Sequence, residues 1–130
     1  MEKDNLSILV VENDPDTLDL YSLEIPDALK SLGIKKYELT ETNSGIKALD
    51  FIEKNNPDVI FLDYYLPGGL TGLEVYIMLS EEQKKNVIFN TVSDMLQYNI
   101  REKFPAEHPK MMKKISTLDE FIDILKDYAA

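Results

Sequence analysis

The chain has 130 residues, enough for one domain with a hydrophobic core, and 44% of them are hydrophobic. Its formal net charge of −10 makes binding to the phosphate backbone of nucleic acids unfavourable. It has no cysteine, no apolar stretch like that of a signal peptide, and no apolar run near the roughly 20 residues that span a bilayer, so we expect a cytoplasmic protein that binds neither nucleic acid nor membrane.

The first half of the chain alternates between apolar runs and amphipathic segments. The run Leu6–Val11 predicts a buried strand, and the next segment has apolar residues three or four positions apart, as helices do, until Gly33. Pro26 lies inside this helical pattern, where a proline costs about 3 kcal/mol, so we expect a bend or break at Ile25–Pro26. Residues 37–41 predict an exposed strand, and residues 44–55 a helix that Ser44 caps.

The second half repeats the alternation three times. The expected strands are 59–62, 86–91 and 110–113, and the expected helices are 73–84, 95–104 and 118–128. Strands that alternate with helices through short loops are typical of a parallel sheet with helices on both faces. The pattern fills the chain, so we expect a single domain over residues 1–130.

Asp63 follows the most apolar run, Val59–Leu62, which reads as a strand buried on both faces. In open parallel sheets, ligands bind outside the carboxyl ends of the strands. Taken alone, Asp63 is equally consistent with a residue that caps a turn.

Polar residues follow the other strands as well. The first strand ends at Glu12–Asp14, the fourth at Thr91, and the fifth at Lys113 and Lys114. Crowded carboxylates either raise a pKa or hold a cation, and oxygen ligands suit Mg²⁺. A lysine and a hydroxyl complement a phosphoryl group, and the central Asp63 can then act as a nucleophile.

Together these segments resemble a response regulator receiver domain of two-component signalling. The resemblance covers residues 6–128 and is carried by Ile8–Pro15, Pro57–Gly68, Val87–Thr91 and Lys113–Ser116. It implies an α/β fold of the flavodoxin-like, doubly wound type, with five parallel strands in the order 2-1-3-4-5 and five helices.

The resemblance implies that Asp63 is the phosphoacceptor and that Thr91 and Lys113 contact the phosphoryl group. Because the strand and helix pattern fills the chain, we expect a stand-alone receiver without an output domain, which takes part in a phosphorelay. The phosphoryl group would come from a histidine kinase or histidine phosphotransfer protein, and a downstream protein would receive the signal. Such a chain is no enzyme beyond its own phosphorylation and dephosphorylation.

The resemblance also implies a Mg²⁺ site formed by Glu12, Asn13, Asp63 and the backbone carbonyl of Tyr65. The family usually has two acidic residues where this chain has Glu12 and Asn13. The amide keeps an oxygen ligand but loses a charge, so we expect Mg²⁺ to bind at least tenfold more weakly than with aspartate. For in-line phosphoryl transfer, we expect one oxygen of Asp63 to face solvent rather than lie under Tyr64 or Tyr65.

Two further departures concern the last strand. The family usually has Tyr or Phe three residues before the lysine, as part of its switch, and counting from Lys113 that position is Lys110. Lys114 replaces the proline that usually follows the lysine, which leaves the register between Lys113 and Lys114 open.

Three other classes of protein could place an aspartate at the end of such a strand: a pseudo-receiver, a flavodoxin-type protein and a phosphatase. Asn13 and Lys110 favour a pseudo-receiver that binds proteins without phosphorylation. A flavodoxin-type cofactor protein would need a phosphate-binding loop after the first strand, where Glu12–Asp14 would repel the phosphate. A haloacid-dehalogenase-type phosphatase would need a second aspartate at the position of Tyr65.

Overall fold

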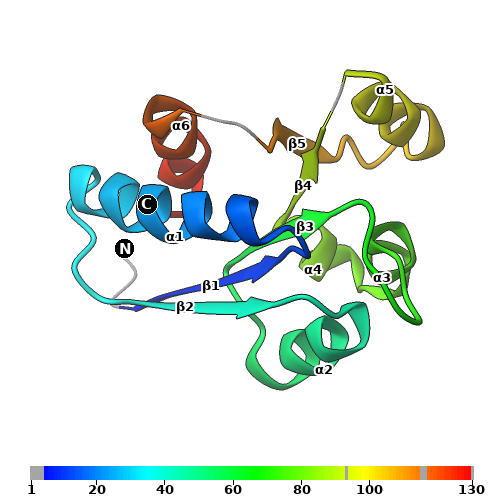
Figure 1. Cartoon of the computed structure of the whole chain (residues 1–130), viewed down its shortest axis with the longest axis horizontal. Coiled ribbons are helices and arrows are strands. Elements are labelled where there is room, and N and C mark those ends of the chain that lie inside the picture. Colours follow the sequence, from blue (N-terminus) through cyan, green and yellow to red (C-terminus); the bar gives the residue numbers. More distant parts are fainter. Residues whose placement is uncertain (1–4, 93, 115–116, 130) are drawn as a thin grey trace.

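The structure, a computed structural model, describes residues 5–92, 94–114 and 117–129. Five parallel strands form one sheet in the order β2-β1-β3-β4-β5, which confirms the predicted fold (Figure 1). Six helices connect and flank the strands in the described residues. The elements are β1 (Leu6–Val11), α1 (Pro15–Ser31), β2 (Tyr37–Thr42), α2 (Gly45–Asn55), β3 (Val59–Asp63), α3 (Gly72–Met78), α4 (Glu81–Lys84), β4 (Val87–Thr91), α5 (Asp94–Lys103), β5 (Lys110–Lys113) and α6 (Leu118–Ala129).

The apolar residues of the strands bury both faces of the sheet. Alternate residues of a strand point to opposite faces, so Phe61 packs in the cluster that includes α1 and α6, and Leu62 packs in the cluster that includes α2, α3 and α5. Figure 1 shows α1 and α6 together on one side of the sheet and α2 on the other. Tyr21 of α1 contacts the rings of Phe61 and Phe121 edge-on, at centroid distances of 5.6 and 4.8 Å.

Of the bend or break predicted at Ile25–Pro26, the break does not occur, because α1 continues through Pro26 to Ser31, and the bend stays a prediction. Ile25 and Leu29, on either side of the proline, are both fully buried against the sheet. Burial of a large apolar side chain stabilises by about 1.5–3 kcal/mol, so two such contacts outweigh the roughly 3 kcal/mol cost of the proline.

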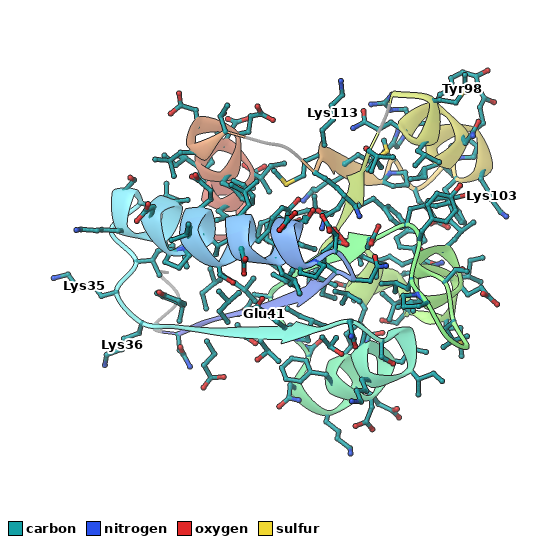
Figure 2. All side chains as sticks on the ribbon, viewed as in Figure 1. Lys35, Lys36, Glu41, Tyr98, Lys103 and Lys113 are labelled. Atoms are coloured by element: carbon teal, nitrogen blue, oxygen red, sulfur yellow. The ribbon has the colours of Figure 1, made fainter. Side chains whose placement is uncertain are left out.

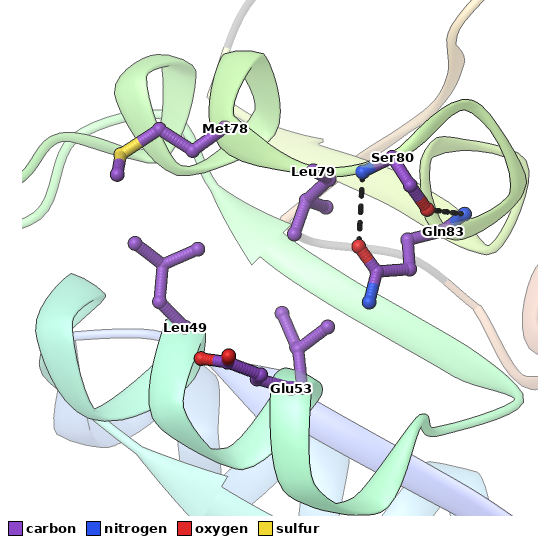
Figure 3. A pocket seen from close by; sticks show the side chains of 7 residues that line it. Leu49, Glu53, Met78, Leu79, Ser80 and Gln83 are labelled. Carbon is purple, nitrogen blue, oxygen red and sulfur yellow. Dashed lines mark hydrogen bonds between the residues drawn. The ribbon is translucent and has the colours of Figure 1, made fainter.

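The expected helix over residues 73–84 is divided into α3 and α4, which accounts for the sixth helix. Leu79 is extended between them, and Ser80 begins α4 with a capping box in which Ser80 and Gln83 bind each other's backbone N–H (Figure 3). A groove of about 490 Å³ lies between α2 and this junction and contains no residue of the predicted site. No helix in the described part of the chain is long and apolar enough to cross a membrane.

Candidate functional site

The parallel register brings Glu12 and Asp63 together at the carboxyl edge of the sheet. Val11 of β1 lies beside Leu62 of β3, so Glu12 and Asp63 are the next residues on neighbouring strands. Both carboxylates are buried, with exposed fractions of 0% and 1%. Two buried carboxylates on neighbouring strands repel each other, so they need a positive charge, a proton or hydrogen-bond donors between them.

Lys114 supplies the positive charge. Its Nζ lies 2.8 Å from Glu12 Oε1 and 3.0 Å from Asp63 Oδ2, and its side chain is only 14% exposed. The backbone N–H of Lys114 donates to the carbonyl oxygen of Thr91 at 2.8 Å, which extends the pairing of β4 and β5 one residue past Lys113. This extra bond holds Lys114 at the sheet edge.

The structure therefore brings Lys114, and not the expected Lys113, to the carboxylates. Lys113 pairs with Thr91 in the sheet register, and its exposed side chain extends outward from the molecule (Figure 2). Successive residues of a strand point to opposite faces, so only one of two adjacent lysines can reach Asp63. Residues 115–116, which complete the segment that resembles the lysine–proline loop, lie outside the described residues.

The corrected register also moves the position that the family's switch aromatic usually occupies. Three residues before Lys114 is Met111, which is half-buried and packs on the α5 side of the sheet. Lys110 has a different environment: its Nζ donates to the Tyr128 hydroxyl at 2.7 Å and lies 4.4 Å from the centre of that ring. Lys110 thus fixes the end of α6 to the edge of the sheet.

Burial raises the pKa of Glu12 to about 7, and the neighbouring Asp63 adds to this increase while Lys114 opposes it. Burial on its own lowers the pKa of Lys114, but the hydrogen bonds to Glu12 and Asp63 outweigh it and the net pKa is raised. Lys114 therefore stays charged near neutral pH, whereas Glu12 takes up a proton more readily than an ordinary glutamate.

Asn13 and Tyr65 provide the remaining contacts of Asp63. With its nitrogen turned inward, the Asn13 amide donates to Asp63 Oδ2 at 2.8 Å and to the Tyr65 carbonyl oxygen at 3.3 Å. The backbone N–H of Tyr65 donates to Asp63 Oδ1 at 3.3 Å. The expectation that an Asp63 oxygen faces solvent is wrong, because Lys114, Asn13 and Tyr65 occupy both oxygens of a side chain that is 2% exposed.

The predicted ligands for Mg²⁺ do converge. The described residues contain no group of three or more His, Cys, Asp or Glu that could hold a metal ion, which agrees with Asn13 standing where the family usually has an acid. The two carboxylates, the Asn13 amide and the Tyr65 carbonyl nevertheless all carry oxygen atoms, the type of ligand that Mg²⁺ prefers. Asp14 has a separate task, since it caps α1 by accepting hydrogen bonds from Thr17 N and Oγ1 at 3.2 and 2.6 Å.

Thr91 lies at the carboxyl end of β4 and is fully buried. Its hydroxyl donates to the Met112 carbonyl oxygen at 3.5 Å and accepts from Gln97 Nε2 at 3.1 Å. Within the described residues, its hydroxyl therefore binds β5 and α5 rather than Asp63. The sequence offered no sign of Gln97, because a glutamine on a helix with no motif around it is usually a surface residue.

Gly72 is a second residue that the sequence did not single out. A Cβ at this position would lie 1.8 Å from the carbonyl oxygen of Asp63, and the Gly72 N–H donates to Tyr64 O at 3.1 Å. The start of α3 thus packs directly on the backbone of the central residue. Three glycines in the loop signalled a turn, but nothing in the sequence distinguished Gly72 from the other two.

A hollow of about 350 Å³ opens beside Lys114. Its other walls are residues at the start of α1 and just after β4: Asp14, Asp16, Thr17, Leu20 and Val92. Val92 is 65% exposed, so the hollow borders on accessible surface.

The fold and the edge that holds Asp63 define a receiver-type signalling domain. The Response regulator receiver domain family matches residues 8–126, and the chain belongs to this family. Receiver domains are signalling modules of two-component systems. The polar-differentiation response regulator DivK of Brucella ovis is 32% identical over 78 residues, a stretch that covers 60% of this chain and 57% of that relative. The chain thus matches little more than half the length of this relative.

Solved structures give the same fold. The receiver domain of sensor histidine kinase PA1611 from Pseudomonas aeruginosa PAO1, described with a magnesium ion coordinated in its active-site cleft, is similar with a TM-score of 0.70 and 26% identity, covering 96% of this chain and 98% of that one. The Francisella response regulator 1452 receiver domain is similar with a TM-score of 0.70 and 24% identity, covering 96% and 97%.

Proposed function

We propose that this chain accepts a phosphoryl group on Asp63 from a histidine kinase or a histidine phosphotransfer protein, and that it signals to a downstream protein by direct contacts. The observation that supports this most is the position of Asp63. It ends the central strand, next to the Glu12 carboxylate and 3.0 Å from the Lys114 ammonium. A carboxylate beside a cation is suited to form an acyl phosphate, because the cation offsets part of the negative charge of the incoming phosphoryl group.

In this reaction an oxygen of Asp63 forms a bond to phosphorus while the bond from phosphorus to the donor breaks. Before this Asp63 oxygen can react, one of the hydrogen bonds that it accepts in the structure has to break. Lys114 lies beside the 350 Å³ hollow, so its long side chain has room to follow the phosphoryl group and bind its oxygens. We assign to Lys114 the role expected for Lys113, and we propose that the Thr91 hydroxyl, which donates to the Met112 carbonyl oxygen, turns to donate to the phosphoryl group instead.

Glu12, Asn13, Asp63 and the Tyr65 carbonyl would hold Mg²⁺, which would supply positive charge against the incoming phosphoryl group. Because Asn13 brings no charge, we expect this cation to bind weakly.

The test is the intact mass of the protein after incubation with Mg²⁺ and acetyl phosphate. We expect one added phosphoryl group on the wild type, none on Asp63→Asn, slower addition to Lys114→Met, and an unchanged rate for Lys113→Met. Phosphorylation of Asp63→Asn to the same extent would refute the assignment of Asp63.

A pseudo-receiver is the second candidate, and one observation favours it. Both oxygens of Asp63 accept hydrogen bonds from groups of the protein itself, and the side chain is almost fully buried. If neither small phosphodonors nor a cognate kinase phosphorylate the wild type, this candidate replaces the first.

A further inference from the structure

Asn13 is where this site departs from the acidic pair that the family usually has, and its amide has two useful orientations. The inward atom of the amide lies 2.8 Å from Asp63 Oδ2 and 3.3 Å from the Tyr65 carbonyl oxygen. With nitrogen at this position, the amide makes a hydrogen bond to each oxygen. With oxygen there, three oxygens face one another, and a cation, a proton or a hydrogen-bond donor has to hold them together.

The orientation with oxygen inward matches the geometry of a Mg²⁺ ligand. Mg²⁺ binds oxygen at about 2.1 Å in a near-octahedral arrangement, so neighbouring ligand oxygens lie about 3 Å apart. The distances of 2.8 and 3.3 Å around the Asn13 amide bracket this value. Asn13 is exposed, so its amide can rotate without displacing packed neighbours.

We propose that Asn13 is a two-position amide. Without a divalent cation its nitrogen donates to Asp63 and Tyr65 and takes the place of the cation, and with a cation its oxygen turns inward as a ligand. This inference rests on the cation site of the proposed function but does not require that Asp63 is phosphorylated.

Aspartate cannot perform both tasks, because an ionised carboxylate has no proton to donate. Asn13→Asp would add a third carboxylate beside Glu12 and Asp63, which share one ammonium from Lys114. The variant should therefore lose stability without a cation and gain affinity for one. Asn13→Ala removes both the donor and the ligand, so it should lose stability and affinity together.

The first measurement is urea unfolding in EDTA. No divalent cation is free there, so only the hydrogen bonds that Asn13 donates can affect stability. We expect the unfolding equilibrium constant to rise about fivefold in Asn13→Ala, the value of one or two exposed hydrogen bonds, and further in Asn13→Asp. Asn99→Asp is the matched control, because it makes the same chemical change at an exposed position of α5; its constant should stay within about twofold. If both Asn13 variants were as stable as the wild type in EDTA, the claim that Asn13 donates stabilising hydrogen bonds without a cation would be overturned.

The second measurement is a Mg²⁺ titration followed by tyrosine fluorescence, since Tyr64 and Tyr65 adjoin the site and the chain has no tryptophan. We expect Asn13→Asp to bind Mg²⁺ at least tenfold more tightly than the wild type, and Asn13→Ala to bind it several-fold more weakly. If Asn13→Ala and the wild type bound Mg²⁺ with equal affinity, the claim that the Asn13 oxygen is a ligand would be overturned.

The rotation itself is visible by NMR in the hydrogen exchange of the Asn13 side-chain amide. Its protons should be protected without a cation and exchange rapidly at saturating Mg²⁺. Protection that does not change would overturn the proposal. None of these measurements uses a phosphodonor, so a failure here is distinct from a failure of Asp63 to accept a phosphoryl group.

Discussion

Replacing Lys114 tests the centre of the site and the register of the last strand at once. Lys114→Met keeps the apolar stem but removes the only ammonium that the described residues place between Glu12 and Asp63. One charge pair at 3 Å is worth about 5 kcal/mol at an effective dielectric of 20, before desolvation, and removing one partner of a buried pair typically costs 3–5 kcal/mol. Protonation of Glu12 relieves part of this loss at low pH. We therefore expect a loss of about 3 kcal/mol at about pH 8.5 and about 1 kcal/mol at about pH 5.5.

The assay is urea unfolding in EDTA at these two pH values, with Lys113→Met as the matched control. Lys113 is exposed, so its replacement should cost less than about 1 kcal/mol at either pH. Equal losses for the two variants, or no loss for Lys114→Met, would refute the assignment of Lys114 to the site.

Three further predictions concern Glu12, Asn90 and Gly72. The folded-state pKa of Glu12, about 7, lies above its ordinary value of 4.5, so its stabilising protonation is complete below pH 4.5 and is lost as pH rises through 7. Glu12→Gln should remove this part of the pH dependence, at most about 3 kcal/mol. If the free energies of unfolding of the wild type and the variant in EDTA changed with pH in parallel, the assignment to Glu12 would be contradicted. Asn90 is fully buried and its amide has no hydrogen-bond partner among the described residues, so Asn90→Val should stabilise the fold by about 1–3 kcal/mol, and a lower melting temperature would count against this. Gly72→Ala would place a Cβ 1.8 Å from the Asp63 carbonyl oxygen and should cost about 1–3 kcal/mol in urea unfolding. In Gly69→Ala the new Cβ meets only the flexible end of a side chain, so an equal loss in that control would contradict the steric argument.

The sequence predicted the five strands well because each is an uninterrupted or alternating apolar run followed by a polar residue, and the resemblance to receiver domains implied the strand order that the sheet has. It predicted the meeting of Glu12 and Asp63 for the same reason, since parallel strands end at one edge. It could not exclude a break at Pro26, where local helix chemistry disfavours the helix but the buried neighbours Ile25 and Leu29 keep it continuous. Tertiary packing of this kind is invisible in a propensity argument.

The sequence could not decide between Lys113 and Lys114. The choice depends on whether β5 pairs with β4 for one residue more, and a single backbone hydrogen bond, from Lys114 N to Thr91 O, determines it. A shift of one residue in a strand moves every side chain to the other face. The orientation of the Asn13 amide was equally hidden, because it depends on which atoms of Asp63 and Tyr65 converge in space.

The balance of charge at Asp63 connects these details. The protein has a net charge of −10, yet it buries two carboxylates side by side, so compensation has to be local. The structure provides it through the Lys114 ammonium and the Asn13 amide, and the raised pKa of Glu12 favours a proton there as a third form of compensation. A phosphoryl group carries about two negative charges at neutral pH but removes the single charge of the Asp63 carboxylate, so phosphorylation would add about one negative charge to the site. Lys114 can follow that charge into the adjoining hollow, and the loss of its contact with Glu12 favours retention of the Glu12 proton, so the site has a means of accepting the charge at the residues that already surround it.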